Sequence, residues 1–230
     1  FNELMQKLKQ ADLELAEAFE KEKEANLRAL QAQINPHFIY NTLNSVSCMA
    51  LLHQENEISQ VLGSLTKVIR YNLKKPDAIV HLEEELENIY SWCRIQECCY
   101  EQSIRFSYDI QVPADQIKIP KLIIQPLIEN AVVHGANFAG EDARICLHIW
   151  MEGKCLYIVV WDNGTDVDTD RINRLACGKG EVCSDSLGVR NVYERIRLRY
   201  GSAGQMRFEQ DEEHHTLVQI VIPAEMDQSL

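Results

Sequence analysis

Apolar residues recur every three or four positions from Leu4 to Ala18, and this repeat ends at Glu22, within a first stretch of about thirty residues that lacks glycine and proline. This spacing predicts a helix with one apolar stripe, as in a short coiled coil, although so few heptads fit a solvated single helix as well. We therefore expect residues 1–30 to form a linker or coiled-coil helix. The apolar positions are Leu4, Leu8, Ala11, Leu15 and Ala18.

Helical periodicity continues to about residue 100, divided by two short polar breaks. The first break is Gln54–Asn56, and the second, Lys75–Pro76–Asp77, contains a proline that a helix interior does not tolerate. The pattern predicts a helical hairpin or bundle over residues 31–100. Its helices are expected at residues 35–53, 57–74 and 82–100.

The hydrophobic pattern changes to strict alternation after residue 101. Residues 104–110 alternate apolar with polar side chains, which predicts a half-buried strand and a domain boundary near residue 101. Short turns such as Glu152–Gly153–Lys154 predict antiparallel hairpins further along. The expected class is α+β, with a mixed sheet backed by helices over residues 101–225. The other strands are expected at 143–151, 155–162, 205–210 and 216–222, and the helices at 121–135, 170–176 and 187–200.

The charge balance and the cysteines limit the kinds of partner. The chain has 35 acidic and 23 basic residues and a formal net charge of -12, which argues against binding along the phosphates of DNA or RNA. The eight cysteines are scattered, several in apolar runs, which indicates buried thiols in a reducing compartment rather than disulfides or a zinc site. No apolar run approaches the roughly 20 residues that span a bilayer.

The segment Gln33–Asn44, QINPHFIYNTLN, gathers polar groups around one imidazole. Helical spacing places His37, Asn41 and Asn44 on one face. A plainer interpretation is a helix that starts at Pro36, with His37 as an ordinary first-turn residue. A continuous helix kinked at Pro36 is a third possibility and costs about 3 kcal/mol.

A second segment, Gln125–Gly135, has the sequence QPLIENAVVHG and places Asn130 and His134 on one helix face. A carboxamide oxygen there can contact Mg²⁺, which prefers hard oxygen ligands and shares them with phosphates. An amphipathic helix with an incidental asparagine fits the same pattern.

Two further segments contain residues that could bind a nucleotide. Asp162 ends an apolar strand, where its carboxylate can accept a hydrogen bond from an adenine amine, and Gly164 lets the backbone approach the base. Gly188 opens a helix whose first N–H groups can meet phosphates. The run Asp162-Asn163-Gly164 is also an ordinary turn sequence.

The order and separation of these segments resemble the LytS/YesM-type sensor histidine kinases, whose ATP-binding module has the Bergerat (GHKL) fold. The resemblance covers about residues 27–222 and rests mainly on NPHFIYNTLN, QPLIENAVVHG and NVYERIRLRYG. It implies a dimerisation and phosphoacceptor domain over residues 31–100, followed by an ATP-binding domain. It also implies a homodimer that uses ATP and Mg²⁺ and serves a response regulator at the cytoplasmic face of the bacterial membrane, to which only an upstream segment would attach it.

The same resemblance assigns roles to single residues. His37 would be the phosphorylated residue. Phe38 follows it, where many other histidine kinases carry an acid that orients the ring, and Asn41 is our own candidate for that task, which the sequence leaves open. Asn130 would contact Mg²⁺ and phosphates, and residues 171–185 would form the ATP lid. The remaining nucleotide contacts would be His134, Asp162, Gly164, Gly188, Arg190 and Asn191.

Three residues around the nucleotide depart from the family pattern. Val133 stands where Lys is frequent, Asp166 replaces the second glycine of DNGxG, and Ser186 replaces the first glycine of GxGL. These changes predict weaker ATP binding and leave open a degenerate signalling dimer of the same fold. An ATPase without histidine transfer is a further alternative, but it leaves the segment around His37 unexplained.

Overall fold

The computed structural model describes residues 36–73, 78–100, 103–135, 143–164, 169–176 and 187–226. The chain divides into two compact units, Phe1–Val46 and Ser47–Leu230. Everything described below belongs to the second unit, apart from the first part of helix α2. The predicted helix over residues 1–30 lies outside the described residues and stays a prediction.

The three predicted helices before residue 100 are present within a few residues of their expected bounds. They are α2 (Pro36–Leu52), α3 (Asn56–Asn72) and α4 (Leu82–Cys99). Gln54, with a φ of 63°, turns the chain between α2 and α3. Within the described ranges, no helix is both long and apolar enough to cross a bilayer.

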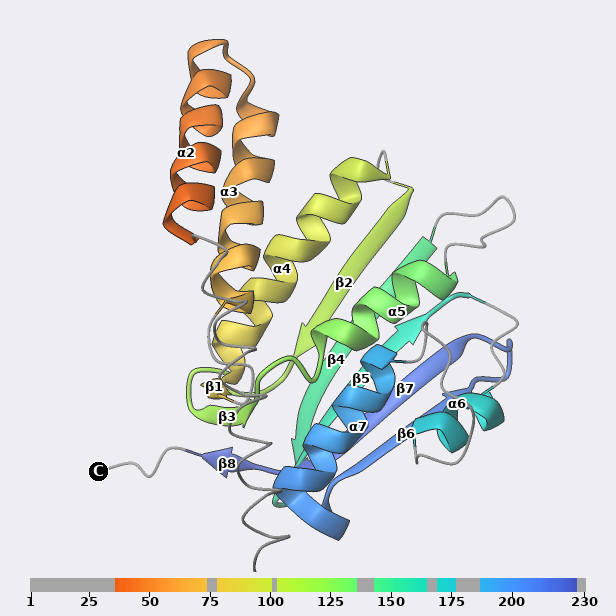
Figure 1. Cartoon of the computed structure of the whole chain (residues 1–230). Coiled ribbons are helices and arrows are strands. Elements are labelled where there is room, and N and C mark those ends of the chain that lie inside the picture. The colour runs from red at the N-terminus through yellow and green to blue at the C-terminus, as the bar shows by residue number, and fades with distance from the viewer. Residues whose placement is uncertain are drawn as a thin grey trace, which may run out of the picture. The chain divides into compact units, whose positions relative to one another are not determined.

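Five strands form one mixed sheet in the order β2-β4-β5-β7-β6 (Figure 1). β2 runs parallel to β4, and the other three neighbouring pairs are antiparallel. Gly153, with a φ of 61°, makes the predicted tight turn between β4 and β5. The predicted mixed sheet and the α+β class are confirmed. The strands are β2 (Ile104–Ile110), β4 (Ala143–Glu152), β5 (Cys155–Asp162), β6 (Gln205–Gln210) and β7 (Thr216–Pro223).

A second sheet of three short strands was not predicted. Its order is β1-β3-β8, and its strands are two to four residues long, too short to show an alternating pattern. The strands are β1 (Ile79–His81), β3 (Ile117–Pro120) and β8 (Glu225–Met226).

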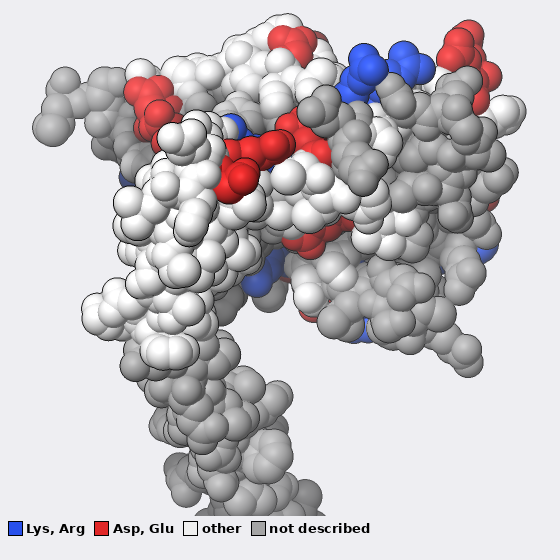
Figure 2. Space-filling view, turned by 90° about the horizontal axis from the view of Figure 1, so that it is seen from above, with Lys and Arg blue, Asp and Glu red and all other residues white. Residues whose placement is uncertain are grey.

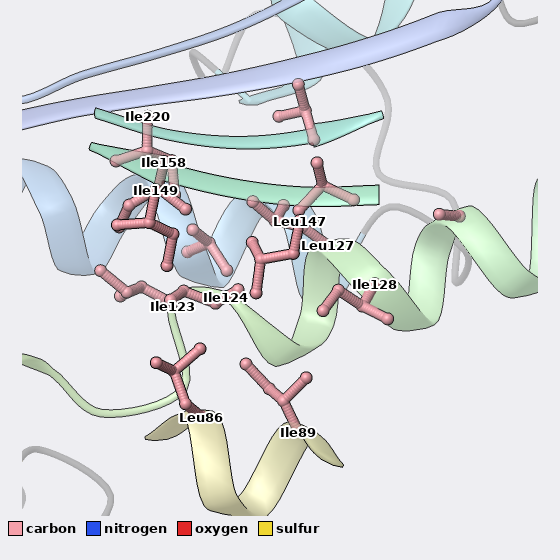
Figure 3. Close-up of a cluster of buried hydrophobic side chains, with 14 of the residues drawn as sticks. Leu86, Ile89, Ile123, Ile124, Leu127, Ile128, Leu147, Ile149, Ile158 and Ile220 are labelled. Atoms are coloured by element: carbon pink, nitrogen blue, oxygen red, sulfur yellow. The ribbon is translucent and has the colours of Figure 1, made fainter. Parts of the chain in front are cut away.

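Helices α4, α5 (Gln125–Gly135) and α7 (Leu187–Tyr200) pack on one face of the five-stranded sheet (Figure 1). Alternate residues of the central strands point toward these helices, and burying each isoleucine there is worth about 1.5–3 kcal/mol. In Figure 3, Leu86 and Ile89 of α4 point toward Ile124, which lies in the segment leading into α5 and faces the sheet on its other side. The start of α5 therefore lies between α4 and the sheet.

The predicted domain boundary near residue 101 stays a prediction, but α4 shares its core with the sheet. Leu86 and Ile89 belong to the same buried cluster as Ile149 and Ile158. The inward face of α4 is therefore part of the sheet-bearing unit.

The helix that we predicted from Lys121 begins later, at Gln125. Leu122 has a φ of 59°, which a right-handed helix does not accept. The backbone N–H groups of Leu122 and Ile124 instead donate to the buried Glu85 carboxylate at 2.8 and 3.2 Å. A side chain from another helix thus takes the place of the first helical turn.

Candidate functional site

His37 lies exposed in the first turn of α2. Its Nδ1 atom is 3.2 Å from Asn41 Nδ2, one helical turn further on, so the two side chains share the expected face. An asparagine amide carries both a donor and an acceptor, and either tautomer of the imidazole can therefore find a partner there. Asn41 is thus placed to orient the ring, whereas the neighbouring Phe38 is 67% exposed and offers no acid.

Helix α5 carries the second set of predicted residues and packs against α7 and strand β5. Asn130 is partly buried on this helix, and Val133 is 66% exposed. His134 lies in the last turn of α5, but its side chain is outside the described part of the chain. The helix that carries Asn130 therefore packs against the strand that ends in Asp162.

Asp162 is the last residue of β5, and only 5% of it is exposed. Its Oδ1 atom accepts a hydrogen bond from the Gly164 N–H at 2.9 Å. Burial raises the pKa of this carboxyl to about 7, and the Gly164 N–H and the nearby His215 only partly oppose that rise. A carboxylate in such a place gains much from a further donor, and an adenine amine is one.

Thr216 lies directly opposite Asp162, at the start of β7. It is 3% exposed, and its Oγ1 atom has no hydrogen-bond partner among the described residues. A buried hydroxyl without a hydrogen-bond partner costs about 1–3 kcal/mol of stability, so a ligand or a water molecule that bonds to it would be stabilising. We did not predict Thr216 from the sequence, although alternation along residues 216–222 places it on the inward face beside Asp162.

Asp211 accepts hydrogen bonds that hold the turn before β7, next to Asp162 and Thr216. Trp161 Nε1 donates to Asp211 Oδ2 at 3.0 Å, and the His215 N–H donates to Asp211 Oδ1 at 2.9 Å. The Trp161 bond is the main reason that the pKa of Asp211 is lowered to about 2. These hydrogen bonds hold the residues that lead into β7 and so determine the position of Thr216.

The first turns of α7 and α5 lie next to each other. A Cβ added to Gly188 would lie 3.7 Å from Pro126 Cβ, an ordinary van der Waals contact. Arg190 Nε donates to Glu194 Oε1 at 2.8 Å, so this guanidinium is held along its own helix, and Asn191 is exposed. The structure therefore brings Gly188 to the start of the Asn130 helix.

Only part of the predicted lid is described. Helix α6 (Thr169–Ala176) is held on the edge strand β6, because Asn173 Nδ2 donates to Phe208 O at 2.8 Å and Asn173 Oδ1 accepts from Phe208 N–H at 2.9 Å. This pairing satisfies backbone groups on an otherwise open sheet edge. Asp166 and Ser186 lie outside the described residues.

Comparison with known proteins decides the family. Residues 25–104 match the family model described as histidine kinase. The sensor histidine kinase YesM of Bacillus subtilis is 35% identical to this chain over 87% of its length. This chain belongs to the sensor histidine kinases of the LytS/YesM type. The sensor protein LytS of Enterococcus faecalis is 28% identical to this chain over 90% of its length.

The fold of this family member is also found in a solved structure. The catalytic domain of histidine kinase ThkA superposes with a TM-score of 0.50 and 17% identity, covering 65% of this chain and 96% of that domain. This likeness concerns the fold alone, and it agrees with the predicted Bergerat-type sandwich. The chain spans about a third of the length of the curated relatives, 34% of YesM and 35% of LytS.

Proposed function

We propose that this histidine kinase chain phosphorylates itself on His37 from Mg-ATP and passes the phosphoryl group to an aspartate of a separate response regulator. The observation that carries the nucleotide part is the buried pair at the end of the sheet. Asp162 presents a carboxylate that gains from a donor, and Thr216 presents a hydroxyl without a described partner. Adenine has an amine and ring nitrogens that suit both groups.

Other residues would hold the phosphates and the metal. Asn130 on α5 would supply a side-chain oxygen, and Mg²⁺, when bound, would neutralise charge on the phosphates. Gly188 lies at the start of α7, where helix N–H groups favour anions. For His134, Arg190 and Asn191, the family resemblance is the only support.

In the proposed reaction, a neutral ring nitrogen of His37 attacks the γ-phosphorus. The new N–P bond forms as the bond to the bridging oxygen breaks, and the electron pair leaves with ADP. This chemistry depends mainly on positioning and on stabilising charge, so Asn41 serves by fixing the imidazole. The aspartate of the response regulator would then take the phosphoryl group and release the neutral ring.

Incubation with γ-labelled Mg-ATP separates this proposal from its rivals. A histidine kinase yields protein label that is labile in acid and stable in base, together with ADP. An ATPase of the same fold yields free phosphate without protein label, and a degenerate signalling dimer yields neither. Free phosphate without protein label, or neither product, would contradict the proposal.

We also propose that the chain acts as a homodimer. Apolar side chains around the turn between α2 and α3 are at least half exposed, and a second copy would remove them from water. Sedimentation equilibrium is expected to show dimers, and Leu52→Lys is expected to weaken association at least tenfold by placing a charge in the contact. Purely monomeric wild-type protein at high concentration would contradict this. The exposed side chains are Met49, Leu51, Leu52 and Ile58.

Val133→Lys is expected to tighten Mg-ATP binding by about 0.5–1.5 kcal/mol, because it adds a cation to α5 near the proposed phosphates in a high-dielectric setting. Val133 is exposed, so the change requires no repacking. Titration with a fluorescent ATP analogue should show a gain that shrinks as ionic strength rises. Val133→Met is the uncharged control, and equal affinity of the Lys and Met variants at low salt would refute the charge argument. Asp166→Gly and Ser186→Gly are expected to add to the gain.

No nucleic-acid partner is proposed. On the described surface that Figure 2 presents, acidic side chains lie in several patches and basic side chains in small separate groups. Binding along a nucleic-acid backbone requires clustered cations. The cytoplasmic location and an attachment to the membrane through an upstream segment stay predictions.

A further inference from the structure

A buried polar cluster joins α3, α4 and the segment that leads into α5. We call it the Glu85 cluster, and it consists of Tyr71 at the end of α3, Glu85 on α4 and Lys121. Glu85 and Lys121 are fully buried, and Tyr71 is 6% exposed. Charged side chains are rarely buried to this degree unless they are paired, because leaving water is costly.

The Glu85 carboxylate binds groups from two other parts of the chain. It accepts a hydrogen bond from the Tyr71 hydroxyl of α3. It also accepts from the backbone N–H groups of Leu122 and Ile124, at 2.8 and 3.2 Å. Lys121 Nζ lies 4.8 Å from the centre of the Tyr71 ring, so a cation flanks the same pair. One side chain thus holds the end of α3 and the entry to α5 at the same point.

A second line of contacts leads from this point to the candidate nucleotide site. Asn88 of α4 donates to Gln125 Oε1, and Gln125 Nε2 donates to Glu129 Oε1 at 2.6 Å. Glu129 directly precedes Asn130. Arg195 of α7 donates to the Lys121 carbonyl oxygen at 2.9 Å. Both helices that carry proposed nucleotide contacts are therefore bound to the segment that Glu85 holds.

The segment that leads into α5 is packed on two sides, so its movement is coupled to that of its neighbours. In Figure 3, Ile123 and Ile124 lie between Leu86 and Ile89 of α4 and the inward side chains of the sheet. Interiors packed in this way transmit displacement rather than absorb it. A shift of α4 or of its partners therefore reaches the start of α5.

We propose that Tyr71 and Glu85 are positioning residues for the nucleotide site, coupling the position of α3 to that of α5 and hence to Asn130. This inference rests on the proposed function, in which Asn130 contacts the metal and the phosphates. If α3 moves away, the buried carboxylate loses the phenol as a donor. Because a buried carboxylate short of hydrogen bonds is costly, its backbone partners at Leu122 and Ile124 must adjust. Since α3 follows the helix that carries His37, the state of the helical hairpin would set the affinity for nucleotide.

Tyr71→Phe tests this coupling because it removes one hydroxyl and keeps the ring that packs beside Lys121. Its matched control is Thr66→Val, which removes a buried hydroxyl of the same helix whose described hydrogen bond goes to Leu62 O of α3. We expect Tyr71→Phe to weaken Mg-ATP binding about fivefold or more, a typical coupling between sites, and Thr66→Val to leave it unchanged. After Glu85→Gln, the further change of Tyr71 should have little additional effect, because the two residues act as one unit.

Amide hydrogen exchange supplies a readout that needs no nucleotide. Tyr71→Phe is expected to speed exchange in residues 122–135, and Thr66→Val is expected to leave that segment at the wild-type rate. Unchanged exchange there in Tyr71→Phe would overturn the coupling, and faster exchange with unchanged Mg-ATP affinity would overturn the positioning role. If the wild-type chain does not bind Mg-ATP at all, the proposed function fails, while the exchange rates still decide whether α3 and α5 are coupled.

Discussion

Replacement of His37 by Gln is expected to abolish the acid-labile protein label obtained from γ-labelled Mg-ATP. A glutamine amide nitrogen has no available lone pair, so it cannot attack phosphorus. His37 is exposed at the start of α2 and belongs to a different compact unit from Asp162, so Mg-ATP affinity should stay at the wild-type value. Gel-based labelling and calorimetry measure the two quantities on the same preparation.

His53→Gln is the matched control, because His53 is also exposed and follows the end of the same helix. It should retain full labelling. Asn41→Ala should label more slowly than wild type, since the imidazole loses the partner 3.2 Å from its Nδ1 atom. Wild-type labelling of the His37→Gln variant would contradict the assignment of the phosphoacceptor.

Asp162→Asn is expected to weaken binding of adenine nucleotides by about 1–3 kcal/mol, because the base loses a charged acceptor at a buried position. The wild-type affinity should itself fall as the pH drops below about 7, where the Asp162 carboxyl takes up a proton. The Asn variant should lack this pH dependence. Calorimetric titration with Mg-ATP between pH 6 and 8.5 measures both effects.

The same substitution should stabilise the fold without nucleotide. The folded-state pKa of about 7 lies above the reference value of 3.8, so folding binds a proton, and the wild type loses stability as pH rises from about 4 through 7. At pH 8, Asp162→Asn should therefore raise the free energy of unfolding by up to about 4 kcal/mol, a difference that vanishes near pH 4. Asp115→Asn, which changes an exposed carboxylate, is the control.

For the binding prediction, an ATP affinity of Asp162→Asn equal to that of the wild type would contradict the adenine role of Asp162.

Much of the candidate site was predictable because it depends on local patterns. Asp162 was identified because it ends an apolar strand, and Asn41 because it follows His37 by one helical turn. Both placements depend only on the periods of strand and helix. The five strands of the main sheet were found for the same reason.

Features that depend on contacts between distant segments could not be predicted from the sequence. Glu85 lies in an acidic run typical of a solvated face, yet its spacing from Leu82, Leu86 and Ile89 places it on the buried side of α4. Its role became visible only where the backbone of Leu122 met it. The same contact explains why α5 begins after Lys121.

Thr216 could not be identified from the sequence for a different reason. Its position in the strand was predicted, but a threonine at a strand start has no distinctive pattern. It became a candidate only when the register placed it opposite Asp162 and left its hydroxyl without a described partner.

The most direct test of the proposed function is to locate the phosphoryl group in the wild-type chain after incubation with Mg-ATP. Digestion and mass spectrometry at neutral to alkaline pH preserve a phosphohistidine. We predict one phosphorylated peptide that contains NPHFIYNTLN, with the added mass on His37. A phosphoryl group on any other residue, or ATP turnover without a phosphorylated peptide, would contradict the proposal.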